Sequence, residues 1–201
     1  GWYMVQSGLV DRPDVSQYRL TAHLGLAIAI YAYVVWLIIG LFSPERQQRD
    51  GALNSVFGII GLVYLMILSG GFVAGTNAGL SFPTWPLMGD SFVPPALYRD
   101  GVTSAFEQAT TIHFNHRMLA YLTGAVLITA AVRGLLTTTD RRLKLASVLM
   151  LTAVCFQIVL GISTVLTHVD IMIAAGHQSG AVVLLTAVLF WVRVYLTQSA
   201  D

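Results

Sequence analysis

Hydrophobic residues along the chain gather into five long runs, which are separated by polar or aromatic segments. Each run holds about 20 residues or more, the length that an α-helix needs to cross a hydrocarbon layer of roughly 30 Å. The runs do not alternate strictly between apolar and polar residues, so the strands of a membrane barrel are not expected. The pattern predicts five transmembrane helices, over residues 20–42, 53–73, 112–136, 143–166 and 174–196.

The composition agrees with a protein that lies in a membrane. Hydrophobic residues make up 56% of the 201 residues and charged residues only 10%. An ordinary soluble domain contains about 25% charged residues. Helices satisfy their backbone hydrogen bonds internally, which lipid requires, so we predict an all-α integral membrane protein. The net charge is +1 and no basic patch suggests a nucleic-acid partner.

Arginine and lysine are distributed unevenly between the two ends of the predicted helices. Seven lie on one side, namely Arg46, Arg49, Arg133, Arg141, Arg142, Lys144 and Arg193. Four lie toward the other side, namely Arg12, Arg19, Arg99 and Arg117. Because the positive excess normally marks the cytoplasmic side, we expect the first group to face the cytoplasm or a mitochondrial matrix.

Three histidines lie near the start of predicted helices that begin on the other side. His23, His116 and His177 are three or four residues into their helices, so at about 1.5 Å per residue they share one shallow layer. Each is followed four residues later by an alanine, which leaves space on the same helix face for a flat ring system. His113 and His168 lack that small neighbour, and we expect them to be interfacial residues.

Ionisable side chains inside a membrane helix are costly and usually functional. The five predicted helices contain no aspartate or glutamate that would pair with a histidine in a proton relay. Histidines from facing helices of a bundle are typical ligands of heme iron. We therefore predict a heme between His116 and His177. The alternative to a heme ligand, for each histidine taken alone, is a residue that only forms a hydrogen bond or lies at the membrane interface.

Two segments of the chain resemble each other, which suggests an internal repeat. In the helices that contain His23 and His177, a tryptophan follows the histidine after 13 or 14 residues, at Trp36 and Trp191. A repeat unit of four helices would account for this spacing. We therefore expect residues 1–50 to be the end of one four-helix half, whose other helices precede Gly1, and residues 51–201 to be a complete second half.

The longest connection between helices spans residues 75–111. Long loops in compact proteins usually carry function. This one combines prolines with the aromatic residues Phe82, Trp85, Phe92 and Tyr98. We expect an ordered interfacial cap that covers a heme edge, with Arg117 paired to a heme propionate. The alternative for the loop is an aromatic anchor at the membrane interface. The alternative for Arg117 is a side chain that only extends to that interface.

Several motifs of the chain resemble the heme A synthase family in its alphaproteobacterial and mitochondrial branch. They are GGFVAGTNAGLSFPTWPLMGD, FNHRMLAYLTG and AAGHQSGAVVLLT, together with the opening GWYMVQSGLVDRPDVSQYRLTAHLGLA. The resemblance covers nearly the whole chain. It implies eight transmembrane helices in two four-helix halves, and an oxidoreductase that converts the C8 methyl group of heme O to the formyl group of heme A for cytochrome c oxidase assembly.

The resemblance also implies roles for individual positions. His116 and His177 match the axial pair of a b-type cofactor heme in the C-terminal half, with Arg117 beside it. His23 matches one of two histidines where the substrate heme binds. The second of these, and a nearby glutamate that takes part in catalysis, match no position of this chain, so no catalytic residue is assigned. Some members carry a cysteine pair in their outer loops, which residues 75–111 lack.

Partners and location follow from the same resemblance. It implies heme O from a heme O synthase as substrate and heme A as product, with the lipid bilayer, an electron acceptor and oxidase assembly factors as further partners; a homo-oligomer is left open. The membrane would be the bacterial cytoplasmic membrane or the mitochondrial inner membrane, with the histidine layer toward the periplasmic or intermembrane side.

Two other classes of protein remain open from the residues themselves. A bis-histidine membrane cytochrome of b type would use the same ligands to pass electrons without modifying heme. A heme-free transporter built from repeats is the second, although its helices are typically interrupted near the midplane.

Overall fold

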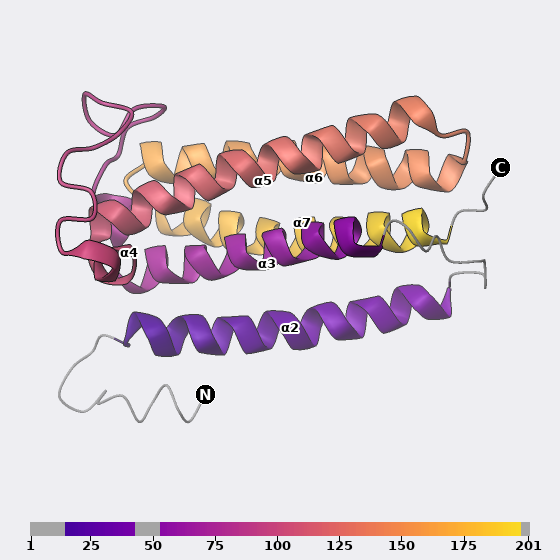
Figure 1. Ribbon diagram of the computed structural model, residues 1–201, viewed down its shortest axis with the longest axis horizontal. Coiled ribbons are helices and arrows are strands. Elements are labelled where there is room, and N and C mark those ends of the chain that lie inside the picture. The colour runs from indigo at the N-terminus through magenta and orange to yellow at the C-terminus, as the bar shows by residue number, and fades with distance from the viewer. Residues whose placement is uncertain (1–14, 43–52, 198–201) are drawn as a thin grey trace.

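The computed structural model describes residues 15–42 and 53–197 (Figure 1). Its long elements are α2 (Gln17–Leu41), α3 (Leu53–Gly75), α5 (Ala109–Thr137), α6 (Arg141–Leu166) and α7 (Ile171–Leu196). All five are long and apolar enough to cross a membrane. The prediction of an all-α integral membrane protein with five transmembrane helices is therefore confirmed. The opening segment with Arg12, and Arg46 and Arg49, lie outside the described residues.

Four of the five helices begin earlier than the hydrophobic runs predicted. The first turns of α2, α5 and α6 contain polar residues, which a hydropathy pattern does not detect, whereas α7 begins with the apolar residues Ile171 and Met172 directly after its N-cap. At α6 the carboxylate of Asp140 accepts a hydrogen bond from the amide of Arg142, at 2.7 Å. At α7 Asp170 accepts from the amides of Met172 and Ile173. Both aspartates are N-caps, which satisfy amides that have no partner within the helix.

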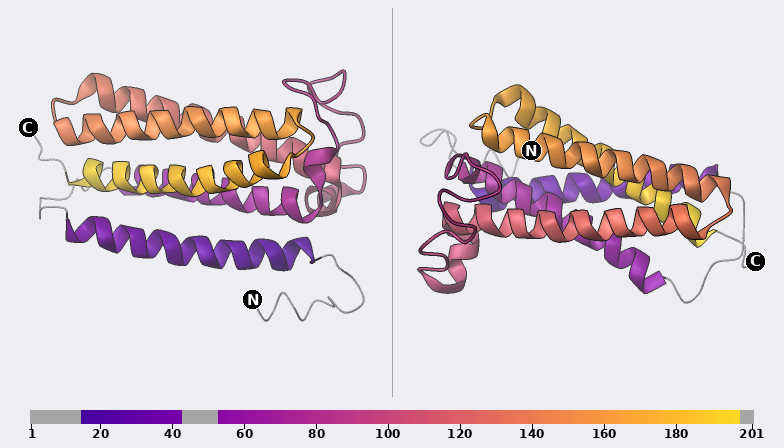
Figure 2. Two further views of the ribbon diagram at one scale, coloured as in Figure 1. Left: turned by 180° about the vertical axis from the view of Figure 1, so that it is seen from behind. Right: turned by 90° about the horizontal axis from the view of Figure 1, so that it is seen from above.

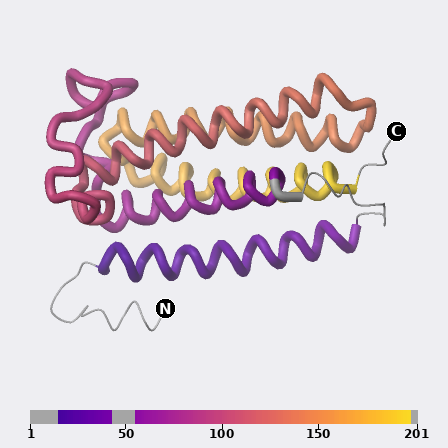
Figure 3. Tube along the Cα trace, in the orientation of Figure 1, coloured from indigo at the N-terminus to yellow at the C-terminus, as the bar shows by residue number. Residues whose placement is uncertain are grey.

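The helices form two packed layers with a fifth helix outside them (Figure 1). α5 and α6 make one layer, α3 and α7 make the next, and α2 covers the other side of α3 and α7. The Cα trace in Figure 3 shows that helices consecutive in the chain run in opposite directions. α3, α5, α6 and α7 thus form a four-helix bundle. In it α5 and α7 each pack against α3 and α6, and so face each other diagonally.

The buried core of the bundle is concentrated at one end. In α6 the buried residues run from Leu143 to Val154, and in α7 from Leu184 to Leu196. The indole of Trp191 donates to the hydroxyl of Ser147 at 2.9 Å within this region. The remaining halves of both helices contain half-buried and exposed residues instead. Tight packing is therefore found at the end that lies opposite the long connection (Figure 2).

The long connection is an ordered cap, as its prolines and aromatic residues predict. It contains the short helices η2 (Ala78–Leu80), η3 (Gly101–Thr103) and α4 (Ser104–Glu107), and an isolated bridge between Met88 and Ser91. Within the described residues this bridge is the nearest approach to a strand. The cap covers the end of the bundle where α5 begins, at the left of Figure 1. We call this end the loop end.

α2 packs on the bundle through one face. At Gly25 an added Cβ would lie 2.9 Å from the side chain of Leu68 on α3. The hydroxyls of Tyr31 and Thr186 are 2.7 Å apart and join α2 to α7. The opposite face of α2 is exposed over its whole length, with Leu26, Ile30, Tyr33, Val34 and Leu37 among its residues.

The close approach of α2 and α3 at the loop end gives a stability prediction. A Cβ at Gly75 would lie 2.8 Å from the Cα of Gln17, and a backbone atom cannot rotate away as a side chain can. Gly75→Ala should lower the free energy of unfolding by about 1–3 kcal/mol, the usual cost of overpacking. Thermal unfolding in detergent micelles, followed by circular dichroism, measures this.

The matched control is Gly61→Ala on the same helix, where an added Cβ meets no atom within 4 Å. Its melting temperature should stay the same or rise slightly, because alanine favours a helix more than glycine does. Equal losses of stability in the two variants would show that the α2–α3 contact at Gly75 is not tight.

Candidate functional site

The structure places the three predicted site histidines in one layer. His23, His116 and His177 lie six, seven and six residues after the first residues of α2, α5 and α7. All three helices start at the loop end (Figure 1), so the histidines lie about 9–10 Å inside it. The layer is three residues deeper than the hydrophobic runs predicted. The shift is the same for each helix, so the common depth is unchanged.

His116 is held from α3. Its Nδ1 lies 2.8 Å from the hydroxyl oxygen of Ser69. The next residue of α3 is Gly70, where an added Cβ would lie 3.5 Å from Cε1 of the same ring. The ring is half-buried. The Nδ1–Cε1 edge of the imidazole is therefore turned toward α3, and Nδ1 is engaged by Ser69.

His177 is held against α6. An added Cβ at Gly161 would lie 2.9 Å from Cε1 of the His177 ring, so only glycine fits there without a shift. The amide of Gln157 donates to the backbone carbonyl of His177 at 2.9 Å. The Nδ1 atom of His177 is buried and has no hydrogen-bond partner in the described part of the chain. His177 also lies within electrostatic range of His116, across the diagonal of the bundle.

His113 lies one turn before His116, but it has a different environment. It is only 2% exposed, so the prediction that it is interfacial was wrong. Its Nε2 accepts a hydrogen bond from Nε of Arg117, at 3.1 Å. Since this nitrogen already has a donor, it has no lone pair left for a metal. His168, in contrast, is exposed in the turn between α6 and α7, as the sequence predicted.

Arg117 fastens the cap to α5. Its guanidinium donates to the backbone carbonyls of Phe82, Thr84 and Leu87, at 2.9, 2.8 and 3.2 Å, in addition to His113. These bonds use four of the five N–H donors of an arginine, and the side chain is 7% exposed. One N–H of Nη1 remains for the predicted propionate contact. The loop-fastening role was not anticipated from the sequence.

Further contacts hold the cap against two transmembrane helices. The hydroxyl of Tyr98 donates to Oδ1 of Asn115 on α5, at 3.1 Å. The carboxylate of Glu107 in α4 accepts from the side chain of Gln17 at 3.0 Å and from the hydroxyl of Tyr18. The cap therefore closes the loop end of the bundle over the histidine layer.

The structure brings His116 and His177 together but leaves His23 apart from them. His23 is on the exposed face of α2, which points away from α3 and α7. His23 lies at the same depth along the bundle as His116 and His177, but its side chain is on an outward face, whereas theirs are partly buried within the bundle.

Sequence reasoning missed three residues that support the two facing histidines, namely Ser69, Gln157 and Gly161. A signal for them was present. Ser69 is followed by two glycines within an otherwise apolar helix, and Gln157 is an amide in the middle of another. Polar side chains in such positions usually bond to a neighbouring helix, but their partners cannot be found from the sequence.

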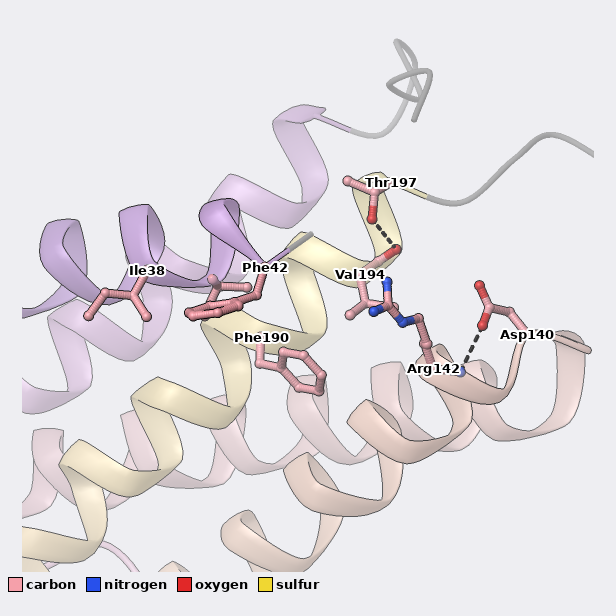
Figure 4. Close-up of a pocket in the computed structure, with 8 residues that line it drawn as sticks. Ile38, Phe42, Asp140, Arg142, Phe190, Val194 and Thr197 are labelled. Atoms are coloured by element: carbon pink, nitrogen blue, oxygen red, sulfur yellow. Dashed lines mark hydrogen bonds between the residues drawn. The ribbon is translucent and has the colours of Figure 1, made fainter. Parts of the chain in front are cut away.

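The described residues also line a partly open pocket of about 220 Å³ at the opposite end of the molecule (Figure 4). Its walls are mostly apolar and come from α2, α6 and α7, with Ile38, Phe42, Asp140, Arg142, Phe190 and Val194 among the lining residues. The carboxylate of Asp140 is engaged as the N-cap of α6. Since the histidines lie near the loop end, this pocket is not part of their site.

The donor set itself limits what the site can bind. Among the described residues, no group of three or more histidine, cysteine, aspartate or glutamate side chains could hold a bare metal ion. Two facing imidazoles suit a metal that brings its other ligands with it, as heme iron does. The glycines let both rings pack closely on neighbouring helices, and the loop-end halves of α6 and α7 are less buried than the opposite halves.

Comparison with known proteins decides the family. A family model described as cytochrome oxidase assembly protein, COX15-CtaA, matches residues 1–189. The chain belongs to this family. Its assignment confirms the resemblance found in the sequence motifs, and the five apolar helices make this member a multi-pass membrane protein.

Relatives in the COX15-CtaA family are similar over nearly the whole chain. A protein of Nitrosospira multiformis named "Heme A synthase" is 45% identical over 200 residues, which are 96% of this chain and 56% of that protein. The human protein named "Heme A synthase COX15" is 38% identical over 203 residues, covering 94% of this chain and 50% of its own length. The chain thus spans about half the length of these relatives.

The role of Arg117 in fastening the cap can be tested by hydrogen exchange. Arg117→Lys keeps the charge but loses the planar fork that reaches several carbonyls at once. The amides of Met88 and Gly89, which bond within the cap at 2.8 and 2.9 Å, should then exchange faster. Arg133→Lys, at an exposed position near the other end of α5, is the control. Unchanged exchange in Arg117→Lys would mean that other contacts hold the cap.

Proposed function

We propose that the protein containing this chain is a heme A synthase, an oxidoreductase that converts the C8 methyl group of heme O to the formyl group of heme A for cytochrome c oxidase biogenesis. The observation that carries the proposal is the histidine layer, in which His116 and His177 come from diagonally opposite helices of the bundle and lie within electrostatic range of each other. Membership of the COX15-CtaA family supports it, as do relatives that are named heme A synthase.

In this proposal His116 and His177 would hold a b-type heme. When bound there, such a heme would supply one-electron transfer, because two histidine ligands suit electron transfer better than oxygen chemistry. The chain's own residues hold the ligands in place. Ser69 contacts the ring of His116, and Gln157 bonds to the backbone of His177. Arg117 keeps one N–H for a propionate while it fastens the cap, which excludes water from this end of the bundle.

His23 serves the substrate in this proposal. Its position on the exposed face of α2 suits a heme O molecule bound on the side away from the bundle. Residues 1–50 then form the end of one four-helix unit, and residues 51–201 form the second. Oxidation of an unactivated methyl group is chemistry for a heme rather than for amino-acid side chains. This chain contributes a ligand to that reaction and no assigned catalytic residue.

The charges of the described residues support an orientation. Five cations lie at the end opposite the histidines, namely Arg133, Arg141, Arg142, Lys144 and Arg193, against Arg19, Arg99 and Arg117 at the loop end. By the rule for positive charge, we propose that the histidine layer lies toward the periplasmic or intermembrane side of a bacterial or mitochondrial inner membrane. Partners would be a heme O synthase, an electron acceptor and oxidase assembly factors.

The test is a spectrum of the full-length protein made together with a source of heme O, followed by chromatography of the extracted hemes. The native protein should show a low-spin b-type spectrum and should produce heme A. His116→Ala and His177→Ala should lose the low-spin signal, because each removes an axial ligand. His23→Ala should keep the signal but lose heme A.

His168→Ala is the matched control, because it removes an exposed histidine from the same end of the protein. It should match the native protein in both spectrum and product. A native protein that shows the b-type spectrum but yields only unmodified heme would be an electron-transfer cytochrome, and the synthase proposal would be wrong.

A further inference from the structure

Ser69 makes two contacts at once. Its hydroxyl oxygen lies 2.8 Å from the backbone carbonyl oxygen of Met66, one turn earlier in α3. The same oxygen lies 2.8 Å from Nδ1 of His116 on α5. Both distances are those of good hydrogen bonds. One serine therefore joins the backbone of α3 to a side chain that comes from 47 residues further along the chain.

The number of protons determines the direction of each bond. A serine hydroxyl has one proton to donate. A carbonyl oxygen can only accept, so the contact with Met66 uses that proton. Toward His116 the serine oxygen must then accept, and Nδ1 of the imidazole must carry the proton. A neutral imidazole protonated on Nδ1 has its lone pair on Nε2, the nitrogen that Ser69 does not contact.

We propose that Ser69 is a positioning residue for His116, which fixes the imidazole as the Nδ1–H tautomer and so presents the Nε2 lone pair to heme iron. The inference rests on the proposed function, in which His116 is an axial ligand. Ligating histidines commonly donate their second ring N–H to a neighbouring acceptor, which orients the ring and raises its basicity. Ser69 supplies that acceptor from a separate helix.

The two proposed ligands differ in this respect. Nδ1 of His116 has an acceptor in Ser69, whereas Nδ1 of His177 is buried without a partner among the described residues. His116 is therefore the more strongly donating ligand of the pair. A stronger donor stabilises ferric over ferrous iron and lowers the reduction potential of the heme, since hydrogen bonding around the ligands is one of the means by which a protein sets that potential.

The experiment compares variants of Ser69 in the full-length protein with its heme bound. Ser69→Ala should shift the midpoint potential of the b-type heme to a more positive value and weaken heme affinity about 10- to 100-fold, the usual effect of removing such a partner. Ser69→Thr keeps a hydroxyl that can bond the preceding turn and should match the native protein. Ser69→Cys, a weaker acceptor, should lie between the two.

The control is Ser147→Ala, which removes a serine hydroxyl that is buried at the opposite end of the bundle and bonded to Trp191. It should lower stability without moving the heme potential. If Ser69→Ala has the native potential, or if Ser147→Ala shifts it equally, the inference about Ser69 is overturned. A native protein without any low-spin bis-histidine signal overturns the proposed function itself, and the two failures are thereby distinguished.

Discussion

Polar side chains that a protein carries into a membrane must be satisfied within the protein, because hydrocarbon offers them no hydrogen bonds. In this chain that constraint determines the arrangement of the site. The buried guanidinium of Arg117 takes the carbonyls of the cap as its partners, and the cap is thereby held over the bundle. His116 takes Ser69 as its partner, and its ring is thereby oriented. The need to satisfy these two side chains thus also positions the groups around them.

The two ends of the bundle differ in how densely they are packed. At the end opposite the cap, large apolar residues of α6 and α7 are fully buried around the hydrogen bond of Trp191 to Ser147. At the loop end, glycines and half-buried residues surround the histidines. Dense packing at one end stabilises the four helices, so the other end can be packed less densely. The cap adds contacts to α2 and α5 at the loop end.

The similar helices α2 and α7 show how one sequence pattern can serve two surroundings. Each has a histidine six residues after its start and a tryptophan further along. His177 points into the bundle beside Gly161, whereas His23 is on the face that points away from it. The tryptophans differ as well. Trp36 lies 5.1 Å from the guanidinium of Arg193, and Trp191 is stacked on Tyr195. In a protein of two halves, this difference would let each histidine face its own heme.

The sequence by itself determined the five helices and the common depth of three histidines. Both depend on local properties, namely apolar runs of sufficient length and a constant rise per residue. Even the early helix starts did not disturb the depth, because the shift was equal in α2, α5 and α7.

Only the tertiary structure decided what each polar residue does. His113 and His116 lie on α5, three residues apart, and Arg117 follows His116 directly in the motif HFNHR. Nε2 of His113 accepts a hydrogen bond from Arg117. His116 is instead engaged through Nδ1, by Ser69. The difference arises because their partners come from distant parts of the chain. Ser69 is 47 residues from His116, and the carbonyls that hold Arg117 are 30 to 35 residues from it. Hydrogen bonds of this kind depend on how the helices pack, which no local pattern contains.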